Sequence, residues 1–126
     1  VESVLDSFQQ IYMSAVYGVT IPNTDGRAGM AAIVLLNPRL EDFDFKSLAE
    51  MLKRELADFA VPRFIRIKEE LEQTPSMKFK KEQLKQEGYD IDKIGGPVYV
   101  LLPGAEEYVL LTDVIRKQID EGVYKL

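Results

Sequence analysis

The sequence has 126 residues, a net charge of −5 and a pI near 4.8, and it contains neither cysteine nor histidine. This length fits one compact domain. The acidic balance argues against nucleic acid as a partner, because binding to phosphates requires a basic surface. Because the chain has no thiol and no imidazole, it cannot form disulfides, and the common catalytic bases and most transition-metal sites are excluded. Lysine, arginine, carboxylates and hydroxyls must therefore carry any catalysis, and we expect no metal site.

The hydrophobic segments are too short to span a membrane. None approaches the roughly 20 apolar residues that a transmembrane helix needs, and the start of the chain shows no signal-peptide pattern. We therefore expect no transmembrane segment and a cytoplasmic location, with peripheral membrane attachment of a parent protein left open. The chain begins directly in an amphipathic pattern at Val1, which suggests a piece of a larger protein.

The first third of the chain has the pattern of a helix followed by a hairpin. Apolar residues at helical spacing predict a helix over 1–10. Two segments rich in β-branched and aromatic residues, 15–21 and 28–36, predict strands joined by a turn that contains Asp25-Gly26. The second strand is almost continuously apolar, which indicates burial on both faces. The two strands should pair antiparallel.

A second helix is predicted over residues 45–59, with Asp44 as its N-cap. Pro62 should end it, because the residue before a proline is pushed toward extended geometry. A third strand is predicted over 63–67. One stripe of this helix is apolar, as the core-facing side of a surface helix should be: Phe45, Leu48, Ala49, Leu52, Leu56 and Phe59.

The last third is less regular. A short helix over 80–88, closed by Gly88, is followed by an apolar extended segment over 95–102. A final helix is predicted over 112–122, with Thr112 as its cap. The element order predicts an α+β domain over residues 1–126, with a small sheet of about three strands and helices packed on it.

Four lysines gather between residues 78 and 85 of this acidic chain: Lys78, Lys80, Lys81 and Lys85. Such a run is commonly a solvated helix face, and Lys81 and Lys85 fit that role. Lys78 differs because it precedes the predicted helix, where a loop lysine is a mobile point charge that can enter another surface's cleft.

Other polar groups have simpler explanations. Residues 25–27 could contact a phosphate but are better explained as a plain turn. The glutamates within 69–72 lack the spacing of a calcium loop, so surface charge explains them better than a metal site. Four tyrosines in apolar settings are candidates for core or domain contacts: Tyr17, Tyr89, Tyr99 and Tyr108.

Two motifs at a fixed separation carry a family resemblance. Residues 56–67, LADFAVPRFIRI, resemble the L-P-x-Y-x-x-P-x-x-F motif near the end of adenylate-forming enzymes. Residues 73–84, QTPSMKFKKEQL, resemble the motif P-x-T-x-x-G-K-x-x-R-x-x-L that follows it in those enzymes. The second match runs through Thr74, Lys78, Lys81 and Leu84.

Within that superfamily the chain is most similar to very-long-chain acyl-CoA synthetases and fatty acid transport proteins. The likeness covers nearly the whole chain, including the C-terminal YVLLTDVIRKQIDEGVYKL. Met77 stands where most of the superfamily has glycine before the lysine, and we interpret this as a trait of the subgroup.

This resemblance implies a function. The chain would be the mobile C-terminal domain of a fatty acid–CoA ligase, with Lys78 as the adenylation lysine and the large N-terminal AMP-binding domain as its partner. Substrates and cofactors would be a fatty acid, ATP, CoA and Mg²⁺. Lys78 would stabilise charge on the α-phosphate during acyl-adenylate formation. The domain would then rotate so that CoA can attack. The isolated chain is expected to be inactive, and the residues that contact cofactors remain unassigned.

Two other functions stay open at this point. A few strands and helices also fit a small-molecule-binding regulatory module of ferredoxin-like type. Alternatively, the basic helix over 80–88 could dock onto an acidic partner or a membrane surface, with strong salt dependence. Neither alternative explains the paired motifs at 56–67 and 73–84.

Overall fold

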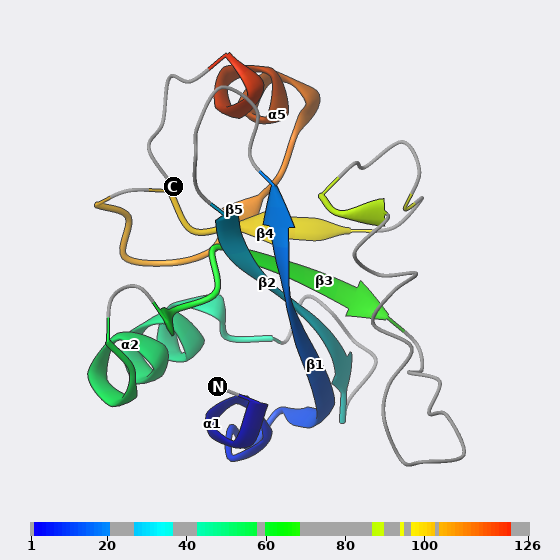
Figure 1. The fold of residues 1–126 in the computed structure, drawn as a ribbon. Helices are drawn as coiled ribbons and strands as arrows, with labels where there is room; N and C mark the ends of the chain where they lie inside the picture. The colour runs from blue at the N-terminus through cyan, green and yellow to red at the C-terminus, as the bar shows by residue number, and fades with distance from the viewer. Residues whose placement is uncertain are drawn as a thin grey trace.

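The computed structural model describes residues 2–20, 27–36, 43–57, 60–68, 87–89, 94, 97–102 and 104–121. Within them the chain folds as an α+β domain built on one five-stranded sheet (Figure 1). The elements follow in this order: α1 (Glu2–Asp6), β1 (Ile11–Thr20), β2 (Arg27–Leu35), α2 (Phe45–Glu55), β3 (Phe64–Lys68), β4 (Val98–Val100), β5 (Val109–Leu110) and α5 (Asp113–Asp120).

The α+β class is confirmed, but the sheet is larger than the three strands expected. The strand order is β1-β2-β3-β4-β5, and the two additional strands, β4 and β5, come from the C-terminal third of the chain. They contain only three and two residues. Strands this short show no alternating pattern of their own. They are recognised only by their hydrogen-bonded pairing with neighbouring strands, and the strands come together only in the folded chain.

The sheet is mixed. β1 and β2 form the antiparallel hairpin predicted from the sequence, whereas β2 and β3 are parallel. Parallel neighbours need a crossover, and α2 provides it between them. β3 pairs antiparallel with β4, and β4 with β5. β2 and β3 are therefore interior strands, which explains why β2 is apolar almost throughout.

Each face of the sheet carries its own hydrophobic cluster. Alternate residues of β2 divide between them: Met30 and Ala32 belong to one cluster, Ala31 and Ile33 to the other. Helices α1 and α2 cover the face that contains Ile33, and α5 contributes Ile119 to the opposite face (Figure 1). The arrangement is a sheet between two helical layers.

The first helix is shorter than predicted. It spans Glu2–Asp6 rather than residues 1–10, and β1 already begins at Ile11. Tyr12 continues the helical spacing of Leu5 and Phe8 in the sequence, but it lies on this strand with 65% of its surface exposed. The side chains of Leu5 and Phe8 are buried as that spacing predicts. A short helix followed by a turn therefore buries the same apolar residues that a longer helix would bury.

The cap of α2 is confirmed. The Asp44 carboxylate accepts a hydrogen bond from the backbone N–H of Ser47 at 3.0 Å. The end of the helix was predicted too late, because α2 stops at Glu55 and Leu56 is already extended (φ −121°, ψ 150°). Extended geometry at Leu56 turns the chain away from the helix several residues before Pro62. Phe59, the last residue of the predicted stripe, lies outside the described residues.

The caps in the C-terminal third also agree with the sequence. The Thr112 hydroxyl accepts a hydrogen bond from the N–H of Ile115 at 3.2 Å and begins α5. Gly88 has φ = 51°, the left-handed conformation expected of a residue that ends a helix. The body of the helix predicted over 80–88 lies outside the described residues.

Candidate functional site

Lys78, the predicted catalytic residue, lies outside the described residues, as do the neighbouring lysines, the glutamates of 69–72 and Asp25-Gly26. The structure does describe the two places between which the Lys78 segment is attached. β3 ends at Lys68, and the description resumes at Glu87. The candidate site is therefore built here from the elements at these two ends.

The first family-like motif, residues 56–67, leads into β3 and fixes it between its neighbours. The Arg63 N–H donates to the Gly29 carbonyl on β2 at 2.9 Å. On the other side, the Leu101 N–H donates to the Arg63 carbonyl at 2.8 Å. Gly29 also lies against the motif, because a Cβ built there would be in contact with the Cα of Pro62 at 3.4 Å. The motif thus determines where β3, and with it the start of the Lys78 segment, leaves the sheet.

Arg66 is a buried cation in the middle of β3. Only 6% of its surface is exposed, and its strand neighbours are Ala32 and Val98. Its Nη2 forms an ion pair with the Glu87 carboxylate at 3.0 Å, and that carboxylate is itself largely buried. Buried charges are rare in proteins unless they are paired. The pair therefore ties Glu87, at the far end of the Lys78 segment, to the strand that precedes that segment.

Tyr17 of β1 is the other buried polar side chain close to this pair. Burial raises the pKa of its hydroxyl, and the positive charge of Arg66 only partly opposes this effect. Among the described residues, the Tyr17 hydroxyl and the Nε and Nη1 of Arg66 have no hydrogen-bond partner. Glu87 is thus the one acid that the described residues place against Arg66.

Tyr89 gives the same segment a second attachment. Its ring stacks on Phe64 of β3, with centroids 4.7 Å apart and planes 5° from parallel. Its hydroxyl donates to the Asp120 carboxylate of α5 at 2.6 Å. Burial and this hydrogen bond both raise the pKa of Tyr89. Tyr89, Tyr17 and Tyr108 are all buried, as the sequence predicted.

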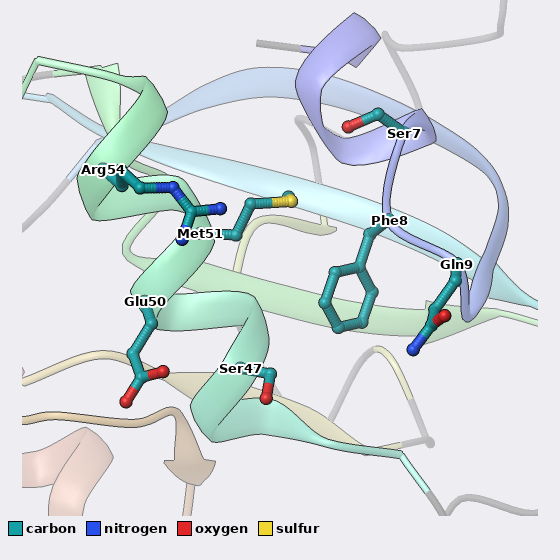
Figure 2. A pocket seen from close by; sticks show the side chains of 7 residues that line it. All are labelled: Ser7, Phe8, Gln9, Ser47, Glu50, Met51 and Arg54. Atoms are coloured by element: carbon teal, nitrogen blue, oxygen red, sulfur yellow. The ribbon is translucent and has the colours of Figure 1, made fainter.

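A hollow of about 350 Å³ lies on the opposite face, between α2 and the turn after α1. Figure 2 shows Phe8 and Met51 extending into the space between these two elements. Polar side chains line the rest of it: Ser7, Gln9, Ser47, Glu50 and Arg54. The hollow is open to solvent.

The described residues contain no group of three or more acidic, histidine or cysteine side chains that could hold a metal ion. Within the same part of the chain, no helix is long and apolar enough to cross a membrane.

Comparison with known families identifies the domain. Residues 1–78 match the model of the AMP-binding enzyme C-terminal domain, and this match includes Lys78 as its last residue. The chain therefore belongs to the AMP-binding enzyme C-terminal domain family. Residues 79–126, which contain β4, β5 and α5, lie beyond the match.

Curated relatives place the chain near fatty acid transport proteins and acyl-CoA ligases. It is 38% identical to human long-chain fatty acid transport protein 6 over 126 residues, covering all of this chain and 20% of the relative. It is 41% identical to the medium/long-chain fatty acid–CoA ligase FadD6 of Mycobacterium tuberculosis, over 86% of this chain and 18% of the ligase. The chain thus spans about a fifth of the length of these relatives.

Solved structures share the fold. The o-succinylbenzoate CoA synthetase of Bacillus subtilis, in complex with its acyl-adenylate intermediate, superimposes with a TM-score of 0.58 at 28% identity. That alignment covers 68% of this chain and 16% of the synthetase. ATP-bound MatB from Rhodopseudomonas palustris also gives 0.58, at 25% identity, over 71% of this chain and 17% of MatB.

Sequence reasoning did not single out Arg66 or Glu87. A signal was present, because Arg66 stands between two isoleucines in a predicted strand, on the same face as Phe64. An arginine inside an apolar strand needs a carboxylate partner, but the sequence offers many acids and does not show which one is near.

Proposed function

We propose that this chain is the C-terminal domain of a fatty acid–CoA ligase and that Lys78 serves its adenylation half-reaction. The observation that carries the proposal is the family match, which extends as far as Lys78, the lysine of the second motif. Relatives that bear the names of fatty acid transport proteins and of a fatty acid–CoA ligase support the substrate class. A large N-terminal domain of the same enzyme would be the partner, since the chain spans about a fifth of these relatives.

The chemistry explains why a lysine is needed. A fatty acid carboxylate oxygen attacks the α-phosphorus of ATP, the bond to the β-phosphate oxygen breaks, and pyrophosphate leaves. Both reactants are anionic, and negative charge develops on the α-phosphate oxygens. An ammonium group held beside these oxygens offsets the repulsion and stabilises the transition state. In the second half-reaction the CoA sulfur attacks the acyl carbonyl carbon and AMP leaves, a step that does not need this charge.

Solved relatives support the nucleotide chemistry, since one holds an acyl-adenylate and another holds ATP. Mg²⁺ would neutralise part of the phosphate charge. We place its ligands in the large domain. This chain's own contribution is then the positive charge of Lys78 and the scaffold that presents it.

The test is to replace Lys78 by alanine in the full-length enzyme and to assay the two half-reactions separately. Acyl-adenylate formation should slow by about 10²–10³-fold, the usual scale for one preorganised charge-stabilising group. Thioester formation from ready-made acyl-adenylate should stay near the wild-type rate. Lys80→Ala and Lys85→Ala serve as controls and should change either step only slightly, because we expect these lysines on a solvated helix face, where single charges contribute little.

Two outcomes would refute the assignment. If Lys78→Ala leaves adenylation unchanged, this lysine is not the catalytic one. If both half-reactions fall by the same factor in folded protein, the substitution damages the domain as a whole.

A further inference from the structure

The family match ends at Lys78, but the folded domain continues well beyond that residue. The C-terminal third contains β4, β5 and α5, and the structure describes its residues 87–89, 94, 97–102 and 104–121. The family-matched part contributes the other elements, from α1 to β3. Contacts between these two parts decide whether the C-terminal third is an appended tail or belongs to the same structural unit.

The backbone of β3 and of the residue before it is hydrogen-bonded to both parts. On one side, the Arg63 N–H donates to the Gly29 carbonyl of β2 at 2.9 Å. On the other side, the Ile67 N–H donates to the Pro97 carbonyl at 3.2 Å. The Leu101 N–H donates to the Arg63 carbonyl at 2.8 Å. Loss of the C-terminal third would therefore turn β3 into an edge strand with unpaired backbone groups.

Side chains of the C-terminal third also belong to both hydrophobic clusters of the domain. Six of them are at most 3% exposed: Val98, Val100, Leu111 and Ile119 on one face of the sheet, and Leu101 and Tyr108 on the other. The first four share a cluster with Met30 of β2, and the other two share a cluster with Leu52 of α2. Because burial of apolar surface is the main driving force of folding, neither face is complete without the C-terminal third.

Two polar contacts join the parts through buried groups. Arg66 of β3 pairs with Glu87 at 3.0 Å, and removal of this acid would leave a buried guanidinium uncompensated. The Tyr108 hydroxyl donates to the Pro62 carbonyl. Detachment of the C-terminal third would break these contacts together with the backbone hydrogen bonds and expose both apolar faces, which makes a partly detached state unfavourable.

We propose that the C-terminal third and the family-matched part form one rigid, cooperative unit. When the domain rotates between the two half-reactions, the C-terminal third then travels with it and does not stay on the large domain as a separate arm. The rotation is an expectation of the proposed function, on which this step of the inference rests. The rigid unit itself rests only on contacts within the chain.

Native-state hydrogen exchange of the 126-residue chain tests the unit through two neighbouring amides. The Arg63 N–H is bonded to the matched part and the Ile67 N–H to the C-terminal third, so each amide reports the opening of one side of this segment. In a cooperative unit both sides open in the same event, and Ile67 should exchange no more than about 10-fold faster than Arg63 after correction for intrinsic rates. Exchange at Ile67 that exceeds this factor would mean that the C-terminal third opens separately, and it would overturn the proposal.

A substitution in each part makes the comparison reciprocal. Val100→Ala weakens the C-terminal third and Leu52→Ala weakens the matched part, since both side chains are fully buried. Each variant should accelerate exchange at Arg63 and Ile67 by the same factor, because a cooperative unit loses stability as a whole. Val114→Ala on α5, where 68% of the valine is exposed, is the control and should leave both rates near the wild-type values. Acceleration at only one of the two amides would show that the parts unfold independently.

Movement is tested in the full-length enzyme with a pair of spin labels. The chain contains no cysteine, so Glu50→Cys on α2 and Val114→Cys on α5 place labels at two exposed positions once other cysteines of the enzyme are replaced. The distance between the labels is measured with a stable acyl-adenylate analogue bound and again with acyl-CoA bound. It should be the same in both states. A second pair, with one label at Glu50→Cys and the other on the large domain, should change its distance as the domain rotates.

The two label pairs separate this inference from the proposed function. A change in the distance between positions 50 and 114 would overturn the rigid unit, whether or not the domain rotates. A constant distance from position 50 to the large domain would refute the rotation instead. The exchange rates of Arg63 and Ile67 would then decide the rigid unit on their own.

Discussion

The hydroxyl of Tyr108 donates a hydrogen bond to the backbone carbonyl of Pro62, 46 residues earlier in the chain. Both residues are buried, and burial raises the pKa of this hydroxyl. Pro62 belongs to the motif that leads into β3, and Tyr108 immediately precedes β5. One contact thus joins the family-matched part of the domain to the C-terminal third, on the face of the sheet covered by α1 and α2.

Removal of this contact should lower stability. Tyr108→Phe keeps the ring but leaves the buried Pro62 carbonyl without its donor, which costs about 1–3 kcal/mol of unfolding free energy. Urea denaturation measures the change. Tyr12→Phe is the control, since Tyr12 is 65% exposed on β1, and it should alter stability by less than about 0.5 kcal/mol. Equal effects of the two substitutions would contradict the role assigned to the Tyr108 hydroxyl.

The α2 layer depends on Leu52, which is fully buried between the helix and the sheet. Leu52→Ala removes buried methyl groups and leaves a cavity, so the unfolding free energy should fall by about 2–5 kcal/mol. Val114→Ala on α5, where 68% of the valine is exposed, should cost far less. A loss below about 1 kcal/mol for Leu52→Ala would mean that α2 does not pack on the sheet as described.

The cap of α5 gives a smaller, local prediction. The Thr112 hydroxyl accepts the hydrogen bond from the Ile115 N–H, and Thr112→Ala should cost about 1 kcal/mol, the usual value of an N-cap. Thr112→Asp keeps an acceptor and should retain most of the stability. Thermal unfolding of both variants checks this, and an alanine variant as stable as the aspartate variant would contradict it.

The capping carboxylate of Asp44 should make the stability of the domain depend on pH. Hydrogen bonds from the Ser47 hydroxyl and N–H hold the pKa of Asp44 below its ordinary value. A carboxylate with a lowered pKa stabilises the folded state above the unfolded pKa of about 3.9, and this contribution disappears as the pH falls through the folded pKa. Asp44→Asn keeps a capping side chain without the charge.

The stability of the wild type relative to Asp44→Asn should therefore be greatest near neutral pH and shrink below about pH 4. Urea midpoints of the two proteins, measured from pH 7 to pH 3, give this difference. A difference that stays constant over the range would show that the Asp44 charge does not contribute.

The isolated chain should not activate fatty acids. Its sequence contains no glycine-rich phosphate-binding loop before a helix and no histidine base, and we therefore expect that it does not position ATP and a fatty acid together. Pyrophosphate release from ATP and oleate by the purified chain should not exceed the rate without protein. Turnover by the isolated chain at an ordinary enzymatic rate would contradict this.

Local signals in the sequence identified the type and order of the elements in the first half, although α1 and α2 both end earlier than predicted. The β-branched runs and the caps at Asp44 and Thr112 depend on residues a few positions apart, and the structure confirms them. Within the predicted stripe, Leu48, Ala49 and Leu52 are buried. The two family motifs were likewise readable without coordinates, and the match over residues 1–78 confirms the family. The role of Lys78 stays a prediction, because that residue lies outside the described part of the chain.

Tertiary structure alone decided the rest. β4 lies inside the extended segment predicted over 95–102, but its place in the sheet depends on its pairing with β3, and β5 in turn pairs with β4. The partners of Arg66 and Tyr108 are Glu87 and Pro62, 21 and 46 residues away. An arginine in an apolar strand needs a carboxylate partner, because an unpaired charge is costly to bury. Which carboxylate reaches it depends on the path of the whole chain, because contacts between distant residues are set by packing and not by local propensity.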